Sequence, residues 1–169
     1  MKVLVTVASK HGATAEIGTA IADTLREAGL YVAELTPEHV NSLAEFDAVV
    51  VGSALYMGRW MGEARDFVNE NAEALSKKPV WLFASGPIIG TLNAPNDGAD
   101  AAEGQKLQEL IGAREARVFA GELKKESLGF VEKQIVKMVK SPWGDYRPWD
   151  EIRAWAESIA HELEAVPAG

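Results

Sequence analysis

Short apolar runs of strand length recur along the chain and predict five β-strands. The runs lie at Val3 to Ala8, Tyr31 to Leu35, Ala48 to Gly52, Val80 to Ala84 and Val118 to Ala120. Several of them are continuously apolar instead of alternating, which is typical of strands covered on both faces. The pattern therefore favours a sheet buried between layers of helices.

Apolar residues with helical spacing fill the intervals between these runs. The groups are Ile17, Ile21 and Leu25 before Gly29; Ala64, Phe67, Val68 and Leu75; Leu107, Leu110 and Ile111 before Gly112; and Ile152, Trp155, Ile159 and Leu163 after Pro148. Strands that alternate with helices predict one doubly wound α/β domain over residues 1–169, with five parallel strands. In such a sheet we expect a ligand crevice where the strand order reverses, at the carboxyl ends of the first and third strands.

Composition limits the chemistry and the partners of this domain. The chain has no cysteine, which excludes disulfides, thiolate metal sites, a cysteine nucleophile and a CxxC redox pair. Its formal net charge of −8 argues against nucleic acid as a partner and suits a basic protein better. No apolar leader precedes the first run and no apolar stretch approaches the ~20 residues of a membrane span, so we expect a cytoplasmic protein without a transmembrane segment.

The segment from Ser9 to Thr14 joins the first predicted strand to the first predicted helix, where a phosphate site would form. Unpaired backbone N–H groups and the helix dipole favour an anion at such a turn. Neither GxxxxGK[ST] nor GxGxxG can be read here, because Gly12 and Gly18 lack the first close glycine. An ordinary strand-to-helix turn with Ser and Thr caps is the competing interpretation.

Two further loops are expected at the same crevice. Gly52 to Gly62 combines two aromatic residues and two methionines with small residues, which suits a planar ring. For Trp60 and Met61 the alternative to a role in ring binding is that they begin the next helix and face its core. Ser85 to Thr91 could bring backbone donors to the edge of the ring. A phosphate loop, an aromatic loop and a polar edge together indicate a site for flavin mononucleotide (FMN).

Other protein families that share such a doubly wound sheet need residues that this chain lacks. A receiver domain needs an aspartate where Gly52 and Ser53 stand and an acidic pair where Ser9 and Lys10 stand, and a small tyrosine phosphatase needs a cysteine in its first loop. No spacing of His and carboxylate residues suggests a metal site. We expect His11 to contact phosphate or solvent, and no side chain to act as a catalyst.

The chain resembles the flavodoxin superfamily, whose [ST]-x-x-G-x-T phosphate motif is matched by Ser9, Gly12 and Thr14. Within it, residues 8–14, 52–58 and 130–149 look most like proteins related to menaquinone-dependent protoporphyrinogen dehydrogenase. The resemblance implies a three-layer sandwich with strand order 2-1-3-4-5. It also implies FMN phosphate binding by Ser9, Lys10, His11, Gly12, Ala13 and Thr14, and an isoalloxazine flanked by Ser53, Ala54, Leu55, Tyr56, Met57, Gly58, Ser85, Gly86 and Pro87.

An insertion at residues 122–142 follows the fifth predicted strand and is shorter than that of the dehydrogenase. Leu128, Val131, Ile135 and Met138 are spaced as in an amphipathic helix, and residues 124–140 hold five lysines against two glutamates. One interpretation is a surface helix with its lysines in water. The other is a lid or a docking surface for a quinone, a porphyrin carboxylate or an anionic membrane.

Three functions remain open from the sequence. The first is an FMN-dependent oxidoreductase similar to protoporphyrinogen dehydrogenase, with a quinone or tetrapyrrole as its small-molecule partner. The second is a one-electron carrier that serves a basic redox protein, and the third is a scaffold without redox activity. In the first two the cofactor carries the electrons.

Overall fold

The computed structural model describes residues 1–56, 58–86, 98–123 and 144–165. Strands and helices alternate through most of the chain, as the apolar pattern predicts. In chain order the elements are β1 (Lys2–Ala8), α1 (Ala13–Glu27), β2 (Tyr31–Leu35), the 3-10 helix η1 (Pro37–His39), β3 (Ala48–Tyr56), β4 (Arg59–Trp60), α2 (Gly62–Glu70), α3 (Ala72–Leu75), β5 (Val80–Gly86), α4 (Gly98–Ile111), β6 (Glu115–Ala120), β7 (Glu122–Leu123), β8 (Gly144–Asp145) and α6 (Trp149–Glu164).

The main sheet has the order β2-β1-β3-β5-β6, and these five strands are parallel. The order confirms the predicted 2-1-3-4-5, since β5 and β6 are the fourth and fifth predicted strands. The short β4 pairs antiparallel with the end of β3. The strand order reverses beside β1, so the carboxyl ends of β1 and β3 flank the expected crevice.

Two strands continue past the carboxyl ends of their apolar runs, and β6 begins at Glu115, three residues before its run. β3 continues to Tyr56 and β5 to Gly86, so Ser53 to Tyr56 and the pair Ser85 and Gly86 end strands, whereas we predicted them as loops. The parallel ladder continues through small residues, because Ser53 pairs with Ala8 and with Ala84. An apolar run stops at the first polar side chain, but backbone pairing does not.

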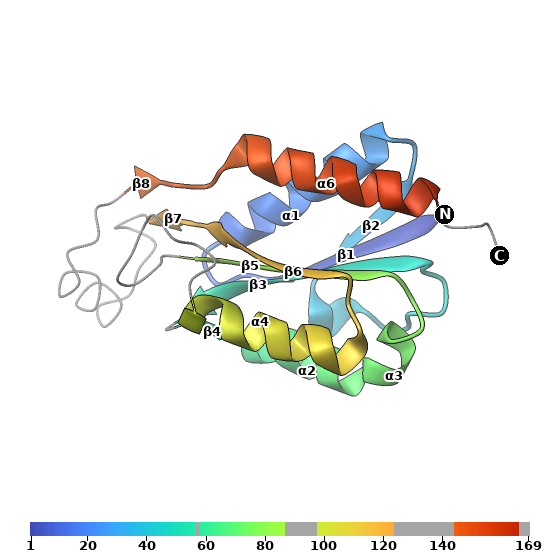
Figure 1. The fold of residues 1–169 in the computed structure, drawn as a ribbon, viewed down its shortest axis with the longest axis horizontal. Helices are drawn as coiled ribbons and strands as arrows, with labels where there is room; N and C mark the ends of the chain where they lie inside the picture. The colour runs from blue at the N-terminus through green and yellow to red at the C-terminus, as the bar shows by residue number, and fades with distance from the viewer. Residues whose placement is uncertain (57, 87–97, 124–143, 166–169) are drawn as a thin grey trace.

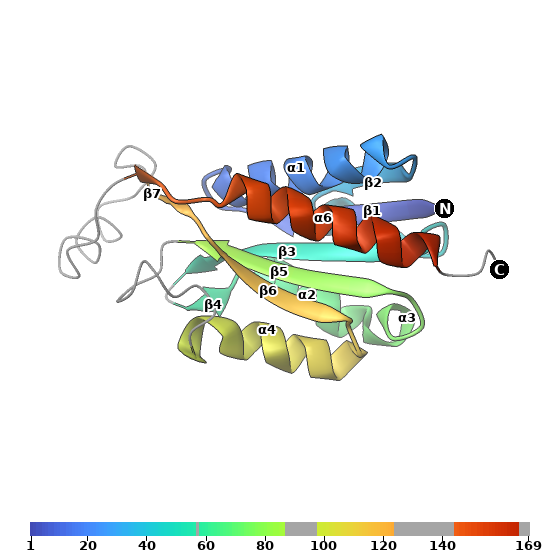
Figure 2. The same cartoon turned by 45° about the horizontal axis from the view of Figure 1, so that its top comes forward.

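Helices cover both faces of the sheet and make three layers (Figures 1 and 2). Helices α1 and α6 lie on one face, and α2, α3 and α4 lie on the other. Each face has its own apolar core. In α6 the four residues predicted to share one side, Ile152, Trp155, Ile159 and Leu163, are all buried, whereas Leu110 of α4 is 51% exposed.

Aromatic side chains form the centre of the core beneath α6. The ring of Trp155 lies 6.2 Å from Phe83 and 5.6 Å from Phe119, both in edge-on geometry. Gly52 is next to this cluster, and a Cβ on Gly52 would come within 2.2 Å of the Phe83 ring. The sheet is therefore packed tightly immediately below the carboxyl end of β3.

Within the described ranges, no helix combines the length and the apolar character that crossing a bilayer requires. The amphipathic helix predicted within residues 122–142 lies mostly outside the described residues. Only its flanks are seen, as β7 and β8, which pair antiparallel with each other. Figure 1 shows this pair beyond the end of the main sheet where β6 terminates.

Candidate functional site

The carboxyl ends of β1, β3, β5 and β6 meet at one edge of the sheet. Along that edge Ala8 pairs with Ser53, Ala54 with Ser85, and Gly86 with Ala120. The three segments predicted to share a site therefore lie side by side: residues 9–14, 53–56 and 85–86. Met57 and Pro87, which we also predicted for the site, lie outside the described residues.

The turn from β1 into α1 is built around Gly12. Its φ of 87° and ψ of −20° place it in the left-handed region, and its N–H donates to Ser9 Oγ at 3.1 Å. A Cβ added there would meet nothing within 4 Å, so the space over the turn is open. Gly12 is the N-cap of α1 and offers no side chain to the first helical turn, which leaves the N–H groups of that turn to an external acceptor.

The capping of α1 bears on the two interpretations of the turn. A plain turn would be closed by a Ser or Thr side chain at the N-cap, and no side chain caps α1. Thr14 is buried, and its hydroxyl donates to the carbonyl of Ser85 at 3.4 Å. Thr14 therefore links α1 to the end of β5, while the helix end itself suits an anion.

Strand alternation sorts the residues at the end of β3. Ser53 and Leu55 are buried, whereas Ala54 is half-buried and Tyr56 is 43% exposed. The hydroxyl of Ser53 accepts the N–H of Met61 at 2.8 Å and donates to the Ala54 carbonyl at 2.8 Å. Ser53 thus fixes the start of α2, and Ala54 and Tyr56 are the residues turned outward.

Tyr56 and Lys10 connect the end of β3 to the turn at Gly12. Lys10 Nζ lies 4.8 Å from the centroid of the Tyr56 ring, a cation–π distance. An exposed ring at the rim of a crevice can stack on a planar ligand. Lys10 and the exposed His11 add basic side chains to the turn.

Trp60 belongs to the core and not to the ring site. It is 2% exposed, and its backbone N–H donates to Glu103 at 2.6 Å. Met61 is half-buried against the same core. The alternative is therefore confirmed in that both residues pack on the core, but Trp60 lies in β4 and not in the next helix, and Met61 is the N-cap of α2.

Glycines allow the strand ends to approach one another closely. A Cβ on Gly86 would lie 2.8 Å from the carbonyl oxygen of Leu55, and one on Gly121 would lie 2.7 Å from Gly86 Cα. Beneath them Ser85 Oγ is buried and has no hydrogen-bond partner among the described residues. Closely packed backbone thus forms the floor of the site, and Ser85 Oγ is a buried polar atom there without a hydrogen-bond partner among the described residues.

Glu34, near the end of β2, interacts with two side chains of α1. It accepts from Thr19 Oγ1 at 2.9 Å and pairs with Arg26 at 2.8 Å. The hydrogen bond that Arg26 donates to Glu34 raises the pKa of Arg26 above its ordinary value. Glu34 therefore stabilises the contact between α1 and β2. Among the residues that the structure describes, no group of three or more His, Asp or Glu side chains could bind a metal ion.

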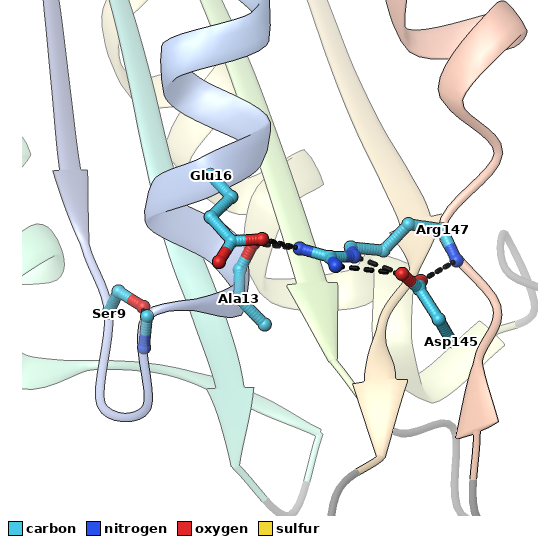
Figure 3. Close-up of polar contacts among 6 residues, drawn as sticks. Ser9, Ala13, Glu16, Asp145 and Arg147 are labelled. Atoms are coloured by element: carbon cyan, nitrogen blue, oxygen red, sulfur yellow. Dashed lines mark hydrogen bonds and ion pairs between the residues drawn. The ribbon is translucent and has the colours of Figure 1, made fainter.

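Arg147 was missed by the sequence analysis. Its side chain is 5% exposed and donates to the carbonyl of Ala13 at 3.2 Å, to Glu16 at 2.6 Å and to Asp145 at 2.7 and 2.9 Å. Figure 3 shows it reaching from the segment between β8 and α6 to the first turn of α1. Asp145 is a near neighbour in the sequence, but no local pattern indicates the contacts with Ala13 and Glu16, which are 134 and 131 residues away.

Comparison with known proteins agrees with this geometry. The flavodoxin domain family matches residues 4–148. The chain belongs to the flavodoxin domain family. Comparison with curated proteins finds no match.

Solved flavodoxins share the fold over nearly their whole length. A flavodoxin from the domain Archaea superposes with a TM-score of 0.68 at 16% identity, covering 97% of this chain and 99% of that chain. A Streptococcus pneumonia TIGR4 flavodoxin gives 0.61 at 20% identity, covering 96% and 99%. Rubredoxin oxygen:oxidoreductase from Desulfovibrio gigas gives 0.64 at 15% identity, but only 36% of that longer chain is covered.

Proposed function

We propose that this flavodoxin-domain protein binds FMN at the carboxyl edge of its sheet and transfers electrons through it. The observation that carries the proposal is the turn at Gly12, where an uncapped helix end lies beneath open space. A phosphate monoester fits such a turn because it accepts several N–H bonds and is favoured by the helix dipole. Membership of the flavodoxin domain family supports a flavin as the ligand.

Each described residue of the site has a definable part in this proposal. The first turn of α1 would bind the phosphate, with Lys10 adding positive charge nearby and His11 offering a ring nitrogen as a hydrogen-bond donor. Tyr56 would stack beside the isoalloxazine, and the strand ends at Ala54 and Gly86 would offer backbone groups to the ring edge. When bound, FMN supplies the electron chemistry, so the protein needs only to position it and set its electrostatic surroundings.

The carrier function has the stronger support. The flavodoxins that resemble this chain match it over almost their full length, without a second catalytic domain. The formal charge of −8 would attract a basic redox protein, which is the partner we propose. The net negative field would also disfavour the fully reduced, anionic flavin and lower its reduction potential.

A second candidate is an oxidoreductase similar to protoporphyrinogen dehydrogenase, acting with a quinone or tetrapyrrole. Its support is the sequence resemblance of residues 8–14, 52–58 and 130–149, together with the position of the insertion. The pairing of β7 with β8, which flank residues 124–143, lies beyond the end of the main sheet where β6 terminates. Contact of residues 124–140 with an anionic membrane belongs to this candidate.

Two measurements test the proposals in sequence. FMN titration, followed by protein and flavin fluorescence, should show saturable binding, and a failure to bind FMN would refute the redox assignment altogether. Anaerobic reductive titration should then resolve two separate one-electron steps for a carrier. One concerted two-electron step, with turnover of protoporphyrinogen and a quinone, would favour the oxidoreductase instead.

A further inference from the structure

Arg147 joins the segment between β8 and α6 to the first turn of α1, more than 130 residues earlier in the sequence. Its guanidinium donates to the first turn of α1 at Ala13 and Glu16 and forms a two-pronged pair with Asp145 of β8. The Cζ atom of Arg147 also lies over the ring of Trp149, the first residue of α6, at 4.5 Å from the ring centroid. An arginine that is 5% exposed and bound on several sides is held in one position.

The contact connects the phosphate turn to the base of the insertion. Asp145 pairs with Glu122 across β7 and β8, and the N–H of Tyr146 donates to the Gly121 carbonyl at 3.1 Å. Gly121 in turn packs on Gly86 at the floor of the site. Arg147 is thus the link between this ribbon and the start of α1.

The charges around Arg147 matter to an anion at the same helix end. Glu16 lies in the first turn of α1, where its carboxylate would repel a phosphate. Arg147 binds that carboxylate and also balances part of the charge of Asp145. In Figure 3 Glu16 points toward Arg147, while Ser9 lies on the other side of the helix start.

We propose that Arg147 is a positioning residue for the FMN phosphate, which holds Glu16 away from the Gly12 turn and offsets part of its charge. The inference rests on the proposed function. It predicts an effect that depends on the phosphate of the ligand and not on the ring, because Arg147 contacts the start of α1, where the phosphate would bind.

The test compares FMN with riboflavin, which has the same ring and no phosphate. Arg147→Gln keeps a hydrogen-bond donor and loses the charge, whereas Arg147→Lys keeps the charge and loses the planar fork. The matched control is Arg153→Gln, which removes an arginine paired with Asp150 on the exposed side of α6. We expect Arg147→Gln to weaken FMN binding about tenfold, the scale set by one uncompensated charge at close range. Riboflavin affinity should change less than about twofold, and Arg153→Gln should change neither affinity.

A second variant separates charge from structure. Adding Glu16→Gln to Arg147→Gln removes both partners of the pair, and it should recover most of the lost FMN affinity if repulsion is the cause. If Arg147→Gln alone fails to fold, the binding test can be made on this double variant, because it leaves no uncompensated Glu16 carboxylate. Arg147→Lys should retain FMN affinity close to that of the wild type.

Three results would overturn the inference. These are an unchanged FMN affinity in Arg147→Gln, an equal loss of FMN and riboflavin affinity, and no recovery in the double variant. Failure of the proposed function looks different, because wild-type protein would then bind neither compound and the inference would fall with it.

Discussion

Substitution of Gly12 tests the phosphate turn most directly, because the chain contains a matched control at the other end of the same helix. Gly12 has a φ of 87° and Gly29 a φ of 94°, and a Cβ on either would meet nothing within 4 Å. Alanine at either position therefore adds left-handed backbone strain without a clash. That strain is about 1–2 kcal/mol per residue. For a chain of this size it lowers the melting temperature by roughly 2–8 °C.

The two alanine variants should lose similar stability and differ in binding. Gly29→Ala should leave FMN affinity unchanged, because Gly29 follows the C-terminus of α1, whereas Gly12→Ala should weaken it as the turn relaxes from its left-handed conformation. Thermal unfolding without ligand measures the strain, and FMN titration measures the site. Equal effects of both variants on FMN affinity would refute the assignment of the turn.

Asparagine and aspartate at Gly12 then separate shape from charge. The two side chains have the same shape and both tolerate the left-handed region. Aspartate should stabilise the unliganded protein by about 0.3–1 kcal/mol relative to asparagine, since it is a negative charge at an uncapped helix N-terminus. It should also weaken FMN binding at least about tenfold relative to asparagine, by repelling the phosphate. Equal FMN affinities of Gly12→Asp and Gly12→Asn would refute an anion at this helix end.

Three further predictions concern the ring site, the core and an ion pair. Tyr56→Leu should weaken FMN and riboflavin binding equally, by about 0.5–1.5 kcal/mol, if the ring stacks on the flavin; a loss confined to FMN would contradict this. Trp155→Ala should lower the free energy of unfolding in urea by about 3–5 kcal/mol, because Trp155 is 2% exposed and packs on two phenylalanine rings, and a loss below about 1 kcal/mol would contradict that packing. Arg26→Gln should cost less than about 1 kcal/mol, since the side chain is 40% exposed. The Glu34 hydrogen bond raises the pKa of Arg26, so this contribution is complete below the unfolded pKa; urea unfolding at pH 7 and pH 9 should give the same cost, and a clear difference would contradict the pairing.

The sequence predicted correctly those features of the fold that depend on residues close together in the chain, and it missed features that depend on distant partners. Strand β2 begins and ends at the predicted residues, and all four predicted residues of α6 are buried, because apolar periodicity reports which side of an element meets the core. The ends of β3 and β5 were misjudged, since a ladder extends as long as a partner backbone is present, whatever the side chain.

In the candidate site, too, some features could be predicted from the sequence and others could not. Ser9, Gly12 and Tyr56 were predictable because strand-to-helix turns and strand ends of a doubly wound sheet converge on one edge. The inward orientation of Ser53 and the bond from Thr14 to Ser85 were not, because strand alternation and a contact between residues 71 apart settle them.

The sequence by itself determined the order of strands and helices, the parallel sheet and the glycine turn at the start of α1. These depend on periodicity and on backbone preferences of neighbouring residues, which are local. Only the tertiary structure decided which carboxylates surround the phosphate turn and that Arg147 binds one of them. Arg147 and Glu16 are 131 residues apart, and packing of the whole domain is what brings their charges together.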